Sequence, residues 1–139
     1  MHDKFQYLKT FKMSKIFRGA NPVIVQLWWL VNALFFKSSP QIMYGWRRFL
    51  LRLFGVKIGN SVIIRSSVTI VYPWKVSIGD YSWIGDNVDL YSLGDIEIGA
   101  NVVISQKSYL CAASHDYTKK DFPIWSKKNT EFHFFTNKK

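Results

Sequence analysis

Aliphatic residues recur at a fixed spacing in the middle of this chain, in three blocks of 20 residues that align without a gap. The blocks run from 58 to 77, from 78 to 97 and from 98 to 117, and each opens on an Ile-Gly pair. Every sixth position within a block is again aliphatic, which gives three columns: Ile58, Ile78 and Ile98; Ile64, Ile84 and Ile104; Ile70, Leu90 and Leu110. A fourth column, Val76 and Ile96, is broken at Asp116. A fixed period of this kind indicates a repeat architecture.

A six-residue period fits neither an α-helix, which repeats every 3.6 residues, nor a flat strand, which repeats every 2. It predicts a triangular coil of three short strands joined by turns, with the aliphatic columns stacked inside at about 4.8 Å per coil. The glycines, with Asn60, Asp80, Asp86 and Asn87, suit corners that need left-handed or turn geometry. A sandwich of short strands is the alternative, and three blocks in register disfavour it.

Two helices are predicted before the repeats. The first has Asn21 as N-cap, Pro22 at its first position and an apolar run to Phe36. The second has Ser39 as cap and Pro40 at its first position, and ends at Gly55. Apolar residues follow at the spacing of one helical face: Ile42, Trp46, Phe49, Leu50 and Leu53. Off that stripe lie Arg47, Arg48 and Arg52.

These helices have two compatible interpretations. They can cap the open end of the solenoid, whose first coil exposes unpaired strand edges. They can also lie in a membrane interface, with Trp28, Trp29, Phe35 and Phe36 entering lipid.

The net charge of +10 is spread unevenly over the 139 residues. Residues 1–57 carry a net +9, the repeats from 58 to 117 carry −3, and residues 118–139 carry +4. The positive charge lies outside the repeats and without a nucleic-acid-binding motif, so nucleic acid is not an expected partner. An anionic membrane surface or a charged glycolipid is more plausible.

Cysteine usage and the N-terminus bear on localisation. Cys111 is the only cysteine, which excludes an internal disulfide and fits a reducing compartment. Residues 1–18 are polar and basic and lack a secretory pattern. We expect a cytoplasmic protein, in peripheral contact with the inner face of the plasma membrane if the helices bind lipid.

Several segments carry a resemblance to a known family: residues 46–55, Tyr72-Pro73-Trp74, residues 82–85, residues 104–106 and, most specifically, residues 110–116 with Ser114-His115-Asp116. The repeat resembles the hexapeptide acyltransferases, and residues 20 to 124 resemble the colanic acid biosynthesis acetyltransferase family. The resemblance implies a mostly β fold, a left-handed parallel β-helix of about three coils after N-terminal α-helices. It also implies a homotrimer, acetyl-CoA as acyl donor, no metal ion, and a sugar or lipid-linked oligosaccharide of exopolysaccharide biosynthesis as acceptor.

In the resembling family the histidine at the position of His115 is a general base that takes the proton from a sugar hydroxyl. Imidazole suits this step because its pKa is near neutral. Asp95 occupies the column of His115 one coil earlier and could orient the imidazole; a solvated corner aspartate is the alternative. Asp116 could help only if the chain has turned, because neighbours on a strand face opposite ways.

A surface formed by Trp83, Asp89 and Tyr91 could receive the sugar, since aromatic faces and carboxylates suit polyols, although such aromatics can instead contact a neighbouring subunit. Asp116 is a further candidate for substrate binding.

The chain departs from the family pattern after Ile124, where further coils would complete the solenoid and line the acetyl-CoA channel. No six-residue period can be traced there. We expect four segments: a basic N-terminus (1–20), a helical cap (21–55), the β-helix (56–117) and an irregular tail (118–139) replacing further coils. The tail would be a truncated C-terminus or a genuine short variant, and most acetyl-CoA contacts would be missing. The competing functions are an O-acetyltransferase, a non-catalytic remnant or assembly subunit, and a glycan-binding protein.

Overall fold

The structure is a computed structural model that describes residues 18–115, 127–129 and 132–134, with backbone alone for 113–115, 127–129 and 132–134. Its helical elements are α1 (Pro22–Val31), η3 (Asn32–Phe36), α2 (Tyr44–Leu53) and η4 (Pro73–Lys75). Its strands are β1 (Lys57–Ile58), β2 (Ile63–Ile64), β3 (Thr69–Ile70), β4 (Val76–Ile78), β5 (Trp83–Ile84), β6 (Asp89–Tyr91), β7 (Ile96–Ile98), β8 (Val103–Ile104), β9 (Tyr109–Cys111), β10 (Ala113–His115), β11 (Lys127–Asn129) and β12 (Phe132–Phe134). Among the described residues, no helix is long and apolar enough to cross a membrane.

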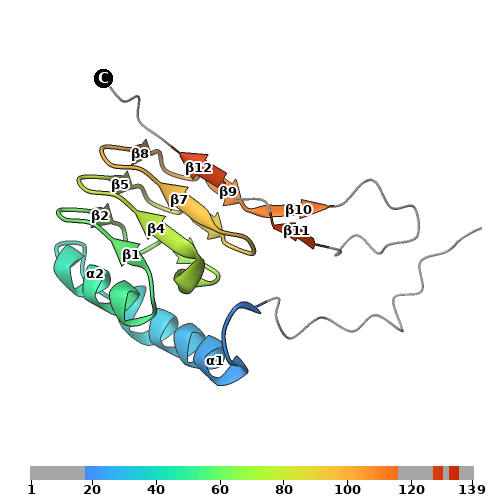
Figure 1. Cartoon of the computed structure of the whole chain (residues 1–139). Helices are drawn as coiled ribbons and strands as arrows, with labels where there is room; N and C mark the ends of the chain where they lie inside the picture. The colour runs from blue at the N-terminus through green and yellow to red at the C-terminus, as the bar shows by residue number, and fades with distance from the viewer. Residues whose placement is uncertain (1–17, 116–126, 130–131, 135–139) are drawn as a thin grey trace, which may run out of the picture.

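The short strands stack as the 20-residue period predicts. They form the parallel ladders β1-β4-β7, β2-β5-β8 and β3-β6-β9, each a side of a triangular coil (Figure 1). The register pairs Ile58 with Ile78 and Ile78 with Ile98, an offset of 20 residues at each step. The other two columns pair in the same way, from Ile64 to Ile104 and from Ile70 to Leu110. The predicted parallel β-helix of about three coils is confirmed.

The aliphatic columns form the core. Ile64, Ile84, Ile70 and Leu90 are almost completely buried, and valines at the corners fill the space between them. Burial of an aliphatic side chain stabilises a fold by about 1.5–3 kcal/mol. The inward-pointing aliphatic columns, which recur every six residues, therefore stabilise the repeat, and the outward-pointing positions carry other side chains.

The corners use two devices. Ser61, Tyr81 and Asn101, again 20 residues apart, have left-handed φ values of 51, 58 and 57°. The repeated glycines serve close approach instead, since a Cβ on Gly79 would lie 2.5 Å from the backbone nitrogen of Ala100. The sequence placed the glycines at corners that need left-handed or turn geometry. At Gly59 and Gly79 the further requirement is the absence of a side chain, because the next coil packs directly on them.

The first helix begins as predicted. Asn21 caps α1, with its Oδ1 accepting a hydrogen bond of 3.0 Å from the amide of Val23. Trp28 and Phe36 are buried beneath it at 1% exposure each, so these two do not face outward as the membrane interpretation required. Trp29 and Phe35, by contrast, are exposed.

The second helix differs from the prediction in where it starts. It begins at Tyr44 rather than after Ser39. The Ser39 hydroxyl donates a hydrogen bond of 2.6 Å to the carbonyl of Phe36 and accepts one of 2.8 Å from Arg47. Ser39 therefore closes the preceding helical segment and anchors Arg47, and it is not free to cap α2.

The buried face of α2 does not coincide with the apolar stripe. Arg47 is fully buried with Leu50 and Leu51, whereas Phe49 and Leu53 are 55% and 68% exposed. Of the predicted apolar stripe, Leu50 alone points inward, and its remaining members Ile42, Trp46, Phe49 and Leu53 are exposed.

The reason lies in the edge of the first coil. In the second coil, the carbonyls of Ile78, Ser82, Ile84 and Leu90 accept hydrogen bonds from backbone amides of the first coil. The equivalent carbonyls of the first coil have no preceding coil to pair with. Side chains of the two helices bind them instead: Arg52 binds Ile58, Arg48 binds Val62, Arg47 binds Ile64 and Trp28 binds Ile70, at 2.7–3.0 Å. The two helices therefore cover the open edge of the first coil, and donor side chains bind its carbonyls.

One strand in the predicted irregular tail extends the solenoid. β12 pairs in parallel with β7, placing Phe132 opposite Ile96 and Phe134 opposite Ile98. The 20-residue offset becomes 36 at this step, because the chain first forms the antiparallel pair of β10 and β11. Figure 1 shows this pair extending away from the coils.

Candidate functional site

The outer surface of β6 and β9 carries most of the candidate chemistry. Because side chains alternate along a strand, Leu90 and Leu110 point into the coil while Asp89 and Tyr91 point out. Asp89 lies opposite Tyr109 in the register. The rings of Tyr91 and Tyr109 stack with centroids 5.9 Å apart and an interplanar angle of 30°. The result is an aromatic surface with a carboxylate at its side.

Tyr109 was missed by sequence reasoning. The 20-residue offset from Asp89 could have placed it there, because it occupies the same column one coil later. Desolvation raises the pKa of the Tyr109 hydroxyl, and its interactions with Cys111, Tyr91 and Asp89 raise it further. Like an ordinary tyrosine, Tyr109 is protonated at neutral pH, and it offers a hydrogen-bond donor beside the acceptor Asp89.

Trp83 does not belong to this surface. It lies on β5, in the ladder β2-β5-β8, whereas Asp89 and Tyr91 lie on the ladder β3-β6-β9. Its partly exposed ring has the guanidinium carbon of Arg65 at 6.0 Å from the ring centroid. The predicted sugar surface therefore divides between two sides of the coil.

His115 is the last residue of β10. Just before β10 begins, the amide of Ala112 donates a hydrogen bond of 3.1 Å to the carbonyl of Tyr91 in the preceding coil. β10 pairs antiparallel with β11, so that the backbone of His115 lies opposite Lys127. The structure does not describe the imidazole itself, and Asp116 lies outside the described residues. The chain thus carries His115 out of the coil directly after the Tyr91–Tyr109 surface.

The predicted stacking of His115 on Asp95 depended on an unbroken register. The offset of 20 residues still pairs Tyr91 with Cys111. At Ile96 it no longer holds, because the strand that follows on that side of β7 is β12, and Ile96 pairs there with Phe132. The strand ladder therefore does not stack the two residues. Asp95 is exposed and borders a 250 Å³ hollow that Lys57, Trp74, Lys75, Val76, Ser77, Ile96 and Glu97 also line. Its role in orienting an imidazole stays a prediction.

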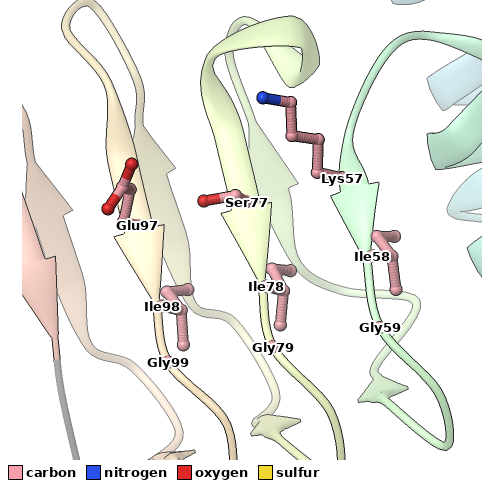
Figure 2. Close-up of a pocket in the computed structure, with 9 residues that line it drawn as sticks. All are labelled: Lys57, Ile58, Gly59, Ser77, Ile78, Gly79, Glu97, Ile98 and Gly99. Carbon is pink, nitrogen blue, oxygen red and sulfur yellow. The ribbon is translucent and has the colours of Figure 1, made fainter.

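A larger open groove of about 410 Å³ runs across β1, β4 and β7 (Figure 2). Its lining repeats every 20 residues, with one row of Ile58, Ile78 and Ile98, one of Gly59, Gly79 and Gly99, and one of Lys57, Ser77 and Glu97. The last row exposes a cation, a hydroxyl and an anion along one face. Sequence reasoning found the isoleucines and glycines but not this polar row.

In the part of the chain that the structure describes, no three His, Cys, Asp or Glu side chains are grouped closely enough to hold a metal ion.

The comparisons with known proteins agree with this architecture. No family model matches the chain. A solved structure, a maltose O-acetyltransferase from Clostridium difficile 630, is similar with a TM-score of 0.52 at 14% sequence identity, covering 73% of this chain and 55% of that one. At that identity the likeness concerns the fold alone, a left-handed parallel β-helix.

Two curated relatives are much more similar in sequence. Both are named colanic acid biosynthesis acetyltransferase WcaF, from Escherichia coli K12 and from Shigella flexneri, and each is 60% identical over 119 residues. The match covers 86% of this chain and spans 65% of the length of these relatives. Over the matched segment the chain is similar to these acetyltransferases, and it spans less than two thirds of their length.

Proposed function

We propose that this protein transfers an acetyl group from acetyl-CoA to a sugar hydroxyl in the biosynthesis of a colanic acid-like exopolysaccharide. The observation that carries the proposal is the 60% identity to relatives named for that process. The stack of half-buried Tyr91 on exposed Tyr109, beside Asp89, adds support, because aromatic rings and a carboxylate bind the faces and hydroxyls of sugars.

In the proposed reaction His115 is the general base. Its imidazole takes the proton of the acceptor hydroxyl as the oxygen attacks the thioester carbonyl of acetyl-CoA. Backbone amides stabilise the oxyanion of the tetrahedral intermediate. The intermediate expels the CoA thiolate, which receives the proton from the imidazolium. The products are the sugar ester and free CoA, and no covalent enzyme intermediate is required.

The proposed acceptor is a sugar or lipid-linked oligosaccharide that rests on the ring of Tyr91. Asp89 would accept hydrogen bonds from its hydroxyls and the protonated Tyr109 would donate one. Asp116 completes the proposed acceptor contacts.

The proposed assembly is a homotrimer on the cytoplasmic side of the plasma membrane. Lateral burial of coil faces would cover exposed side chains such as Val103 and Trp83, which are 69% and 43% exposed. Peripheral contact with the membrane through the helices is argued separately below.

The test measures CoA release and acetyl incorporation by the purified chain with acetyl-CoA and oligosaccharides from de-acetylated exopolysaccharide. We expect acceptor-dependent CoA release that falls about 100-fold or more in His115→Ala, the usual contribution of a general base. Full activity in His115→Ala would refute the assigned mechanism. Oligosaccharide binding with no turnover, in the parent and the variant alike, would favour a glycan-binding protein instead.

A further inference from the structure

In the helical cap, charged side chains face the protein and apolar side chains face outward, the reverse of a helix that packs its apolar side on a core. The inner side of α2 carries Arg47, Arg48 and Arg52, whose guanidinium groups bind carbonyls of the first coil. Its outer side carries Trp46, Phe49 and other apolar residues. Since the coil edge needs donors, the cationic stripe faces the protein and the apolar stripe is left outside.

This apolar surface continues from α2 onto the first helix. The indole nitrogen of Trp46 donates a hydrogen bond of 3.2 Å to the carbonyl of Phe35, which joins α2 to η3. The rings of Trp46 and Phe49 stack at 5.8 Å. We call this surface the cap face, and its large exposed apolar residues are Val23, Ile24, Leu27, Trp29, Leu30, Leu34, Phe35, Ile42, Met43, Trp46, Phe49 and Leu53. Exposed apolar residues in such number on neighbouring helical elements mark an interaction site.

The charge around the cap face selects the partner. Residues 18–57 contain six Lys or Arg and no Asp or Glu, and of the six Lys37, Arg52 and Lys57 are exposed. A second copy docked through the same face would bring these positive charges together and be repelled. An anionic bilayer is complementary instead, because it offers negative headgroups to the cations and an apolar interior to the side chains. Exposed tryptophans such as Trp29 and Trp46 also suit the boundary between headgroups and lipid tails.

We propose that the cap face docks the protein on an anionic phospholipid surface. Because α1 and α2 cover one end of the coil stack (Figure 1), docking would turn that end toward the bilayer. The third coil then lies about 10 Å farther from the lipid than the first, at two coil spacings. Sequence patterning suggested lipid contact through Trp28 and Phe36 as well, but those residues are buried.

The first experiment is vesicle flotation of the full chain, without acetyl-CoA, so that its result is independent of the acetyltransferase proposal. We expect binding to vesicles of phosphatidylcholine with 30% phosphatidylglycerol, and at least tenfold weaker binding to phosphatidylcholine alone, because basic residues near a surface favour anionic lipid. Equal binding to both vesicles, or to neither, would refute the proposal.

A matched pair of variants locates the surface. Leu30→Glu with Phe49→Glu places two charges on the cap face, at residues 56% and 55% exposed. Tyr81→Glu with Val103→Glu adds the same charges on the coils, at residues 64% and 69% exposed. We expect at least a tenfold loss of vesicle binding in the first pair and retention in the second. Equal loss in both would attribute binding to net charge and overturn the cap face.

A second readout needs no acidic variant. Brominated lipids quench tryptophan within the bilayer, so Trp29→Phe should reduce the quenched fraction whereas Trp83→Phe, on a coil face, should not. A lipid-free sedimentation experiment completes the test. If the cap-face variant dissociates an oligomer that the parent forms, a second copy covers this face and the lipid proposal is wrong.

Discussion

Arg47 donates a hydrogen bond of 2.7 Å from its Nε to the carbonyl oxygen of Ile64, on the open edge of the first coil. One coil later, the equivalent carbonyl of Ile84 accepts from the amide of Arg65. The Arg47 side chain therefore donates the hydrogen bond that a backbone amide of a preceding coil would otherwise donate. A charged donor suits this place because a buried carbonyl without a partner is costly.

Arg47→Met should destabilise the protein by about 3 kcal/mol or more. The change keeps much of the apolar stem but removes the hydrogen bonds to Ile64, Ser39, Pro40 and Gln41, and charged hydrogen bonds contribute about 1.5–3 kcal/mol each. The measurement is urea unfolding followed by circular dichroism.

Arg48→Met is the matched control, because half-buried Arg48 has a single such bond, to Val62. It should cost about 1–2 kcal/mol. Equal losses in the two variants would contradict the importance of the buried network around Arg47.

The repeated part of the fold could be predicted from the sequence because each inward column repeats one chemical requirement at one spacing. The face of α2 could not. Its apolar stripe suggested a buried side, but the edge carbonyls that decide the matter are visible only once the first coil is placed beside Arg47. Local amphipathicity was thus overridden by the hydrogen-bonding needs of a strand edge.

The candidate site was predictable to a similar extent. Asp89 and Tyr91 follow from strand alternation and lie together. Trp83 lies apart from them because β5 and β6 form different sides of the triangle. The stacking of Asp95 under His115 assumed that the period continues, and the β10–β11 pair breaks it through long-range pairing that no local pattern encodes.

Gly79→Ala should destabilise the coils by more than 1 kcal/mol. The added Cβ would lie 2.5 Å from the Ala100 nitrogen and 2.6 Å from the Gly99 carbonyl carbon, both backbone atoms that cannot rotate away. Overpacking of this kind costs about 1–3 kcal/mol. Thermal unfolding monitored by circular dichroism measures the change.

Gly45→Ala provides the comparison, since the nearest atom to its Cβ would be the flexible Arg48 Nη2 at 3.9 Å. Gly45 lies in α2, where alanine is favoured over glycine by up to about 1 kcal/mol. The two substitutions should therefore shift the melting temperature in opposite directions. If Gly45→Ala lowered the melting temperature, or if Gly79→Ala left it unchanged, coil spacing would not set the glycine requirement.

Asp95→Asn should lower acetyl transfer at least tenfold without altering stability if Asp95 orients the His115 imidazole. A carboxylate favours the charged imidazole, so its loss should also move the acidic limb of kcat/KM, on which the base loses its proton, to lower pH. Glu97→Gln, in the same hollow, removes an equal charge and serves as the control. Unchanged turnover and pH profile in Asp95→Asn would leave Asp95 as a solvated corner residue.

Tyr72 should make the protein less stable in strong alkali. Its side chain is 8% exposed and stacks on Trp74, with ring centroids 5.5 Å apart. Burial raises the pKa of its hydroxyl, and the nearby Arg18 offsets only part of that rise. Above pH 10, the ordinary tyrosine value, the unfolded chain releases this proton before the folded one does. Stability is therefore complete below pH 10 and falls as pH rises through the folded pKa. Urea unfolding between pH 8 and pH 11 should show a steeper loss for the parent than for Tyr72→Phe. Parallel curves would mean that the hydroxyl ionises equally in both states, so that burial does not hold its proton.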